Sequence, residues 1–427
     1  MIRANQKRKS SQKLQQQQPP QQQQSSIMEN RSSQKEVFIV SAVRTPMGSF
    51  GGALASLTAV QLGTIAIQAA LQRLNLDPSQ VDEVVMGNVL SANLGQNPAR
   101  QAAIGAGLPW KVVATTVNKV CASGTKSIMF GSQAILLGTA DCVVVGGMES
   151  MSNAPYYLPK QRWGSKYGDQ QVIDGLQKDG LWDVYHDYAM GNAAESTAVE
   201  QKVSRTEQDD FAIASYERAQ TALNEGWLKD EIVPVNIPGF KGKPGKVIAA
   251  DEEIMNLNKE KLRALKSAFK EGGSITAGNS SPLSDGAAAI VLMSGEKVKE
   301  LGLKPIGRVR GWGDAAREPA EFTIAPSLAI PKALKHAGIR SISEIDYIEL
   351  NEAFSVVGIA NAKLLGVSHD KINVFGGAVA MGHPLGCSGA RIVVTLLNVL
   401  NRKGAKVGVA GVCNGGGGAS AVVIERV

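Results

Sequence analysis

The sequence predicts an α/β protein built from two similar units packed as a pseudo-twofold pair. Three observations support this fold class. Short apolar runs typical of buried strands alternate with segments of helical periodicity. The order of these segments occurs twice along the chain. A stretch of different composition separates the two copies, which indicates a region inserted between them.

The first copy begins at 37–43, a β-branched apolar run (VFIVSAV) typical of a buried strand. The segments after it are a helix with apolar residues at Val60, Ile67, Leu71 and Leu74, a strand at 84–89, a Cys-containing turn, a helix at about 125–137 and a strand at 142–145. This alternation predicts a sheet covered by helices.

The second copy follows at an offset of about 265 residues. The segment Ala122-Ser-Gly-Thr corresponds to Cys387-Ser-Gly-Ala, and Val81-Asp-Glu-Val-Val-Met-Gly corresponds to Ile345-Asp-Tyr-Ile-Glu-Leu-Asn. Two copies of more than about a hundred residues are typical of paired domains, not of a solenoid. We expect an N-terminal domain at 35–297, a C-terminal domain at 303–427, and a loop domain inserted at about 152–276 with a helix at 206–223.

Composition narrows the classes of function. No apolar run approaches the roughly 18 residues that span a bilayer, so no membrane association is expected. Most of the net charge of +7 lies in the Gln-rich tail at 1–34, which has six basic residues and one acid and is expected to be disordered. No aromatic residues lie between the basic residues of this tail, so we expect no nucleic-acid partner. Four scattered cysteines indicate a reducing compartment, and we expect the cytoplasm, with a mitochondrial location as the alternative.

Cys121 lies where small residues lead from an extended segment into a helix. Backbone N–H groups and the helix dipole at such a position favour a thiolate, so we expect the thiol pKa to fall below its usual value of about 8.5. The alternative is a small core residue, which is the ordinary role of a buried cysteine. The glycine-rich turn favours a reactive thiol.

His383 lies in the glycine-rich segment 374–391, where few side chains remain to pack against it. We expect its imidazole to be presented rather than buried. In the repeat it falls just before the counterpart of Cys121, so the pseudo-twofold axis predicts that the two residues are close. The histidine then serves as the base for the thiol. Its alternative is a helix N-terminal histidine bonded to backbone.

A second thiol and an amide complete the candidate site. Cys413 begins Cys-Asn-Gly-Gly-Gly-Gly between two β-rich runs, and four glycines in a row suggest either unusual backbone angles or the close approach of a ligand. A flexible hairpin is the alternative. Asn351 follows the strand 347–350, at an edge where α/β sheets bind ligands. A nucleophile, a base, a second thiol and amide donors are the groups that acyl transfer through an oxyanion requires.

These motifs resemble the thiolase family, most nearly the acetoacetyl-CoA thiolases of eukaryotes, and the resemblance covers about 36–427. Its motifs are Val43-Arg-Thr-Pro-Met-Gly, Gly95-Gln-Asn-Pro-Ala-Arg-Gln-Ala, Asn118-Lys-Val-Cys-Ala-Ser-Gly, Gly146-Gly-Met-Glu-Ser-Met-Ser, Asn351-Glu-Ala-Phe, Gly382-His-Pro and Cys413-Asn-Gly-Gly-Gly. The resemblance implies a thiolase fold: two βαβαβαββ domains forming a five-layered α-β-α-β-α core.

The resemblance also implies an activity, the reversible Claisen condensation of two acetyl-CoA molecules to acetoacetyl-CoA and CoA. Cys121 would carry the acetyl group and His383 would activate it. Cys413 would remove an α-proton from the second acetyl-CoA, and Asn351 would hold a water at the enolate. The N–H groups of Cys121 and Gly415 would meet the oxyanion.

Coenzyme A contacts and a cation site are implied in the same way. The contacts are Ser281, Met190, Lys261, Tyr216 and Phe354. Ala189 stands where many relatives have histidine, which removes or replaces one pantetheine contact. Potassium would be bound at Tyr216, Ala277, Gly278, Ser280 and Val379. The family uses no obligatory cofactor beyond coenzyme A thioesters and forms dimers and tetramers, so we expect a homodimer or homotetramer.

Two other functions remain open. A degradative 3-ketoacyl-CoA thiolase would share every catalytic residue, although Glu318-Pro-Ala-Glu-Phe-Thr-Ile-Ala-Pro is more similar to the acetoacetyl enzymes. A non-catalytic acyl-CoA- or lipid-binding protein is the alternative from another class. The intact reactive positions speak against it.

Overall fold

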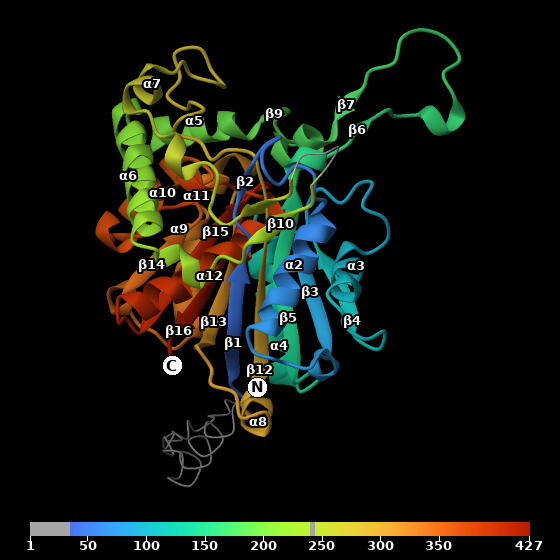
Figure 1. Ribbon diagram of the computed structural model, residues 1–427. Helices are drawn as coiled ribbons and strands as arrows, with labels where there is room; N and C mark the ends of the chain where they lie inside the picture. Colours follow the sequence, from blue (N-terminus) through green and yellow to red (C-terminus); the bar gives the residue numbers. More distant parts are fainter. Residues whose placement is uncertain (1–34, 240–243) are drawn as a thin grey trace, which may run out of the picture. The chain divides into compact units, whose positions relative to one another are not determined.

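A computed structural model describes residues 35–239 and 244–427 (Figure 1). The expectations for the tail at 1–34 lie outside these residues. Most of the described chain forms one compact unit, Glu36–Val427. Its main strands are β1 (Val37–Arg44), β3 (Glu83–Gly87), β4 (Val113–Val117), β5 (Cys142–Ser150), β12 (Ser284–Ser294), β13 (Gly307–Ala316), β14 (Tyr347–Leu350), β15 (Val407–Asn414) and β16 (Gly418–Glu425), and the short β2 (Gly48–Ser49) pairs with β12.

The strand order repeats between the two halves of the unit, as the sequence predicted. The first half has the order β4-β3-β5-β12-β1, and the second has β14-β15-β16-β13. Next to β14, the place of β4 is taken by Ile372, which forms a parallel bridge with Ile348. The halves join where β1 and β13 pair antiparallel, with Phe38 opposite Arg308.

Helices cover both halves and fill the space between them. The helix α2 packs on β12 and β5, α9 packs on β13 and β16, and α4 and α12 lie against each other between the two halves. This arrangement makes five layers in the order α-β-α-β-α. The helices of the layers are α2 (Ala59–Gln72), α3 (Pro98–Gly105), α4 (Ser123–Leu137), α8 (Gly295–Glu300), α9 (Pro326–His336), α10 (Ser355–Leu365), α11 (Ala378–Met381) and α12 (Leu385–Arg402).

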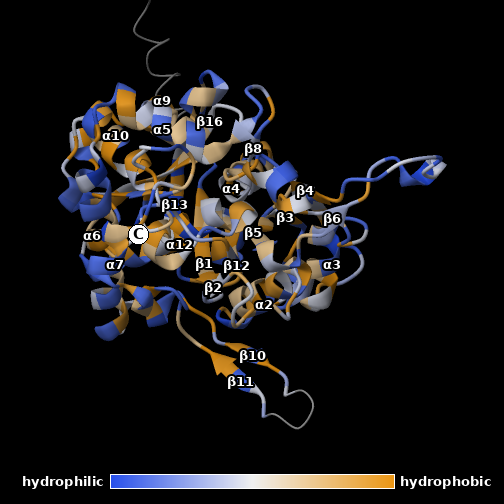
Figure 2. Ribbon diagram, turned by 90° about the horizontal axis from the view of Figure 1, so that it is seen from above, coloured by the Kyte–Doolittle hydropathy of each residue, from blue (hydrophilic) through white to orange (hydrophobic). Residues whose placement is uncertain are grey.

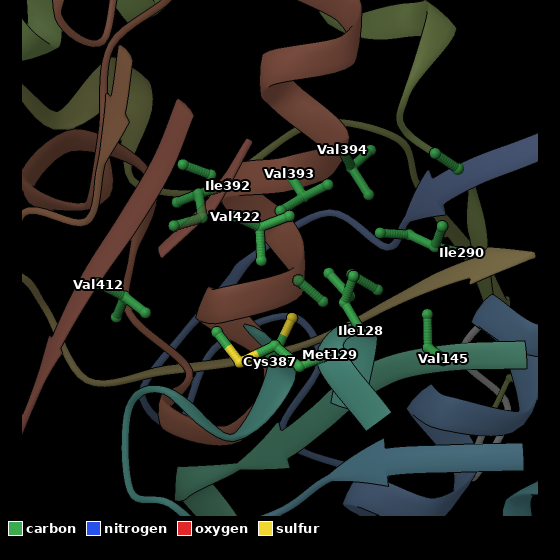
Figure 3. Close-up of a cluster of buried hydrophobic side chains, with 14 of the residues drawn as sticks. Ile128, Met129, Val145, Ile290, Cys387, Ile392, Val393, Val394, Val412 and Val422 are labelled. Carbon is green, nitrogen blue, oxygen red and sulfur yellow. The ribbon is translucent and has the colours of Figure 1, made fainter. Parts of the chain in front are cut away.

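The central core forms where α4 and α12 meet the sheet. Figure 3 shows Ile128 and Met129 of α4 near Val393 of α12, and all three are fully buried. Cys387 is buried in the same cluster. In Figure 2 the central strands are largely hydrophobic, whereas the chain beyond β6 ends in a hydrophilic tip.

Between β5 and β12 the chain leaves the sheet. Its elements are β6 (Tyr156–Tyr157), β7 (Ile173–Asp174), β8 (Trp182–Asp183), β9 (Tyr188–Ala189), α5 (Met190–Glu200), α6 (Arg205–Asn224), β10 (Val235–Ile237), β11 (Lys246–Ile248) and α7 (Lys259–Ala264). The predicted helix at 206–223 is confirmed as α6, which begins at a capping box formed by Ser204 and Glu207. The fully buried Arg44 of β1 binds Glu231 and Asp251 and so fastens this region to the sheet.

Among residues 35–239 and 244–427, no helix combines the length and the apolar character needed to cross a membrane.

Glycines let α4 and α12 touch at their N-terminal ends. A Cβ atom on Gly124 would lie 2.5 Å from the backbone N of Ala390, and one on Gly389 would lie 2.5 Å from the backbone N of Thr125. The Thr125 hydroxyl donates to the Gly389 carbonyl at 3.0 Å. Gly124 and Gly389 occupy matching places in the repeat, so each helix approaches the other through the same residue. This contact brings the segments before the two helices, which carry Cys121 and His383, to one place.

Candidate active site

Cys121 follows a strained turn between β4 and α4. Val120 has φ +49°, an uncommon conformation for a β-branched residue. Its N–H donates to Asn118 Oδ1 at 2.9 Å, and its carbonyl accepts from the Ser123 hydroxyl at 2.6 Å. These bonds hold the turn that directs Cys121 into the site.

The Cys121 thiol is buried, and 7% of the residue is exposed. Burial raises its pKa to about 12, although hydrogen bonds from the backbone N–H groups of Gly415 and of Cys121 itself act in the opposite direction. The expected lowering of this pKa is therefore wrong, because desolvation outweighs the helix N-terminus. The sulfur is a neutral thiol that needs a base, and it lies beside two converging N–H donors.

His383 is buried, which corrects the expectation that its ring would be presented. It still lines the cavity described below. Burial lowers its pKa to about 3, and the Arg391 charge adds to the shift. The imidazole is therefore neutral and able to accept a proton.

Ser388 selects the tautomer of this imidazole. Its hydroxyl lies 2.9 Å from the carbonyl of Pro384 and 2.6 Å from His383 Nδ1. The carbonyl can only accept, so the single hydroxyl proton is donated there. The hydroxyl oxygen then accepts from Nδ1–H, which leaves Nε2 without a proton and available as the base.

Asn351 and Cys413 lie beside this pair. Asn351 Nδ2 is 3.4 Å from the His383 ring nitrogens, and its Oδ1 has no partner within the described residues. Cys413 of β15 is fully buried. Burial raises its pKa, and a negative charge on Cys121 raises it further, as expected for neighbouring thiols. The structure thus brings together the four side chains that the sequence selected.

A cavity of about 230 Å³ opens onto the group. Cys121, His383 and Gly415 lie at its wall. Of the residues expected to bind coenzyme A, Ser281, Met190 and Phe354 also line it, together with Ala189 at the start of α5, whereas Lys261 and Tyr216 do not. The substitution at Ala189 therefore lies in the cavity wall.

Aromatic residues that the sequence did not single out narrow this cavity. Phe269 and Phe322 both line it, and each meets Phe354 edge-on, with ring centroids 6.2 and 6.5 Å apart respectively. Phe269 follows a Lys-rich stretch without periodicity, so no sequence signal marked it. Phe322 lies in the motif that suggested a short acyl substrate.

Glu149 was also missed as part of the site. Its buried carboxylate accepts from Asn88 Nδ2 at 2.8 Å and from the N–H groups of Leu90 and Gly386 at 3.1 and 2.8 Å. Glu149 therefore ties β5 to the first turn of α12, next to His383. Its motif, Gly146-Gly-Met-Glu, was noted only as part of the resemblance.

The residues named for potassium fall near one another. Tyr216 and Val379 belong to one small apolar cluster with Leu262, and Gly278 approaches the same Leu262. Burial raises the pKa of Tyr216 to about 12, so its hydroxyl is neutral. No group of three or more His, Cys, Asp or Glu side chains in the described chain could hold a metal ion.

Comparison with known families agrees with this geometry. A model of the thiolase N-terminal domain matches residues 37–296, and one of the thiolase C-terminal domain matches 303–426. The chain belongs to the thiolase family. The predicted family and thiolase fold are confirmed.

Relatives and solved structures extend the comparison. The chain is 61% identical to an acetyl-CoA acetyltransferase of Schizosaccharomyces pombe, over 92% of this chain and 99% of the relative. It is 58% identical to a cytosolic acetyl-CoA acetyltransferase of Gibberella zeae, over 92% and 98%. The crystal structure of Acat5 thiolase from Ascaris suum in complex with coenzyme A is 46% identical, with a TM-score of 0.87 over 92% of this chain and all of that one.

Proposed function

We propose that this thiolase is an acetyl-CoA C-acetyltransferase that interconverts two acetyl-CoA molecules with acetoacetyl-CoA and CoA. The observation that carries the proposal is the Cys121 thiol, which receives two backbone N–H bonds at the wall of an apolar cavity beside a neutral histidine. Relatives that are about 60% identical to this protein over most of the chain are acetyl-CoA acetyltransferases. The chain is an acyltransferase of the same kind.

The first half-reaction transfers an acetyl group to sulfur. His383 Nε2 takes the thiol proton as the Cys121 sulfur bonds to the thioester carbon. The carbonyl oxygen becomes an oxyanion and accepts from the N–H groups of Cys121 and Gly415, each worth roughly 3 kcal/mol of barrier. The carbon–sulfur bond to CoA then breaks, and CoA leaves as a thiol with the proton of Cys413, while His383 keeps the Cys121 proton on Nε2.

The second half-reaction forms the carbon–carbon bond. Cys413, now a thiolate because it has given its proton to the departing CoA, removes an α-proton from the second acetyl-CoA. The enolate oxygen accepts from Nε2–H of the protonated His383 and from a water bound to Asn351 Oδ1, which has no partner within the described residues. The enolate carbon attacks the acetyl-cysteine, the Cys121–acetyl bond breaks, and acetoacetyl-CoA forms. The Cys121 sulfur takes back its proton from His383, and Cys413 keeps the α-proton as its thiol proton. Cleavage of acetoacetyl-CoA is the same sequence reversed.

Binding of coenzyme A is proposed at the mouth of this cavity. Ser281, Met190 and Phe354 supply its wall, and Lys261 and Tyr216 lie on α7 and α6 outside the lining. Mass spectrometric footprinting with and without CoA would test these contacts. If Lys261 is equally exposed with and without CoA, it is not a coenzyme A contact.

Potassium is proposed at Tyr216, Ala277, Gly278, Ser280 and Val379. These positions offer only hydroxyl and main-chain oxygens, which suit a hard cation of low charge better than a transition metal. A melting temperature that is the same in potassium and sodium chloride would reject the site.

A homodimer or homotetramer in the cytoplasm completes the proposal. The edge strand β4 leaves Val113 59% exposed, and Trp110 just before it is 79% exposed, an apolar edge that pairing would cover. A monomer by light scattering would contradict the assembly. Cell fractionation would distinguish the cytoplasm from mitochondria, the alternative compartment.

Substrate length separates this function from degradative 3-ketoacyl-CoA cleavage. We expect kcat/KM for acetoacetyl-CoA to exceed that for a long-chain 3-ketoacyl-CoA, such as 3-ketopalmitoyl-CoA, at least about 100-fold, because Phe322 and Phe354 narrow the cavity. Thiolysis with CoA, followed as loss of the 3-ketoacyl thioester, measures both. Equal rates would favour the degradative enzyme, and no turnover of either would favour a non-catalytic acyl-CoA-binding protein.

Replacing Ser388 by alanine tests the tautomer argument. Without the hydroxyl, Nδ1–H loses its acceptor, so we expect acetylation of Cys121 to slow roughly 10-fold with little change in KM. Rapid-quench mass spectrometry measures this single turnover. Ser132→Ala is the control, since Ser132 is equally buried and its hydroxyl, within the described residues, bonds only the Ile128 carbonyl of α4. Equal acetylation rates in the two variants would reject the role of Ser388.

A further inference from the structure

The two N–H donors at the Cys121 sulfur come from different halves of the molecule. The Cys121 N–H lies in the turn before α4, in the first half, and the Gly415 N–H lies in the loop between β15 and β16, in the second half. Both donors have to point at the place where the oxyanion forms, and a misplacement of about 1 Å lowers a rate about 100-fold. A contact between the turn and the loop is therefore needed to hold the two donors at a fixed separation.

Lys119 makes a contact of this kind. It belongs to the turn, two residues before Cys121, and its ammonium group reaches the second half of the molecule. The ammonium donates to Asp314 Oδ1 of β13 at 2.6 Å, to the Ser420 hydroxyl of β16 at 2.7 Å and to the Ala419 carbonyl at 3.2 Å. These bonds use all three of its protons, and every acceptor lies across the boundary between the halves.

The acceptors lie at the base of the hairpin that presents Gly415. Ala419 is opposite Cys413 in the register of β15 and β16, and the loop with Gly415 connects these two positions. Ser420 is opposite Asp314 in the register of β16 and β13, and its hydroxyl donates to Asp314 Oδ1 at 2.6 Å. The bonds of the ammonium therefore fix the hairpin only a few residues from the second oxyanion donor.

The turn before α4 is strained, so it depends on contacts that impose its conformation. Val120, between Lys119 and Cys121, has φ +49°. The Lys119 N–H donates to the Ser123 hydroxyl at 2.8 Å, which fixes the shape of the turn but not its distance from the hairpin. The bonds of the Lys119 ammonium supply this second constraint.

Lys126 binds the same carboxylate and provides a comparison within the chain. It lies on α4, and its ammonium donates to Asp314 Oδ2 at 2.6 Å. The two lysine side chains are similarly buried, with 27% of Lys119 and 21% of Lys126 exposed. Partial burial alone would raise the pKa of Asp314, but hydrogen bonds from both lysines and from Ser420 lower it to about 2, so the carboxylate is charged at neutral pH. In the part of the chain that the structure describes, Lys126 makes no hydrogen bond to β16.

We propose that Lys119 is a positioning residue for acetyl transfer, which fixes the N–H of Cys121 relative to the N–H of Gly415 by binding the β15–β16 hairpin. This role rests on the proposed function and adds a residue to it. Lys119 does not line the cavity at Cys121, so it acts through the backbone that carries the two donors.

Two reactions of the same thiol test the proposal. Acetylation by saturating acetyl-CoA passes through an oxyanion, whereas alkylation by iodoacetamide releases iodide and forms no oxyanion. Lys119→Met should therefore lower the ratio of the acetylation rate to the alkylation rate at Cys121 at least about 10-fold. Rapid-quench mass spectrometry with peptide mapping measures both single turnovers. Lys126→Met removes a similarly buried ion pair with the same carboxylate and should leave both rates unchanged.

An unchanged ratio in Lys119→Met, or the same fall in Lys126→Met, would overturn the proposal. Ser420→Ala locates the effect: it should slow acetylation by itself but add little to Lys119→Met, because both variants remove the same contact. Additive effects would mean that Lys119 does not act through the hairpin. If the wild-type protein gains no acetyl group, the proposed function itself is rejected, and this role with it.

Discussion

Replacing Cys121 by serine is expected to abolish the acetyl adduct that wild-type protein gains on incubation with acetyl-CoA, and to lower turnover at least about 10⁴-fold. The turn at Val120 and the N–H of Gly415 would remain in place, so binding should change little. The loss would come from the weaker nucleophilicity of the hydroxyl. Intact mass spectrometry, followed by peptide mapping, measures the adduct.

The other cysteines supply matched controls. The pKa of the Cys142 thiol is also raised to about 12 by burial, but that thiol lies in a separate core cluster, so Cys142→Ser should retain the adduct. Cys413→Ser should also be acetylated, yet it should not complete condensation, because the base for the α-proton is lost. No adduct on the wild type, or an adduct that persists in Cys121→Ser, would contradict the assigned nucleophile.

The sequence located the chemistry but not its electrostatics. Strand and helix positions followed from periodicity, and the repeat predicted that His383 lies near Cys121, with which it lines one cavity. Neither the periodicity nor the repeat predicts how deeply a side chain is buried. The helix N-terminus at Cys121 therefore suggested a thiolate, while the folded chain surrounds the thiol with enough apolar material to raise its pKa to about 12. A neutral thiol beside a neutral imidazole makes proton transfer part of the acylation step.

Residues that act through tertiary contacts could not be found in the same way. Ser388 matters because its hydroxyl meets both the Pro384 carbonyl and the His383 ring, and Glu149 matters because it reaches Gly386 across 237 residues. Both lie in motifs that were noted without a role. The walls formed by Phe269 and Phe322 come from segments whose local pattern is unremarkable, so only the folded arrangement reveals them.

Replacing Gly389 by alanine is expected to destabilise the protein, although helix propensity alone predicts a gain of about 1 kcal/mol for this exchange. The added Cβ would lie 2.5 Å from both the backbone N and the hydroxyl of Thr125, so α12 has to move away from α4. Overpacking of this kind costs about 1–3 kcal/mol or more, because backbone atoms cannot rotate out of the way. Chemical denaturation measures the free energy of unfolding.

The same displacement should reach the site, because α4 begins just after Cys121 and α12 just after His383. We expect Gly389→Ala to lower the rate of Cys121 acetylation as well as stability. Gly295→Ala is the control: this glycine opens α8, and its added Cβ meets only the Phe38 ring, at 3.2 Å, so stability should stay within about 1 kcal/mol of wild type. If Gly389→Ala is as stable and as readily acetylated as Gly295→Ala, the two helices tolerate separation. The contact between Gly124 and Gly389 then does not set the position of the nucleophile relative to its base.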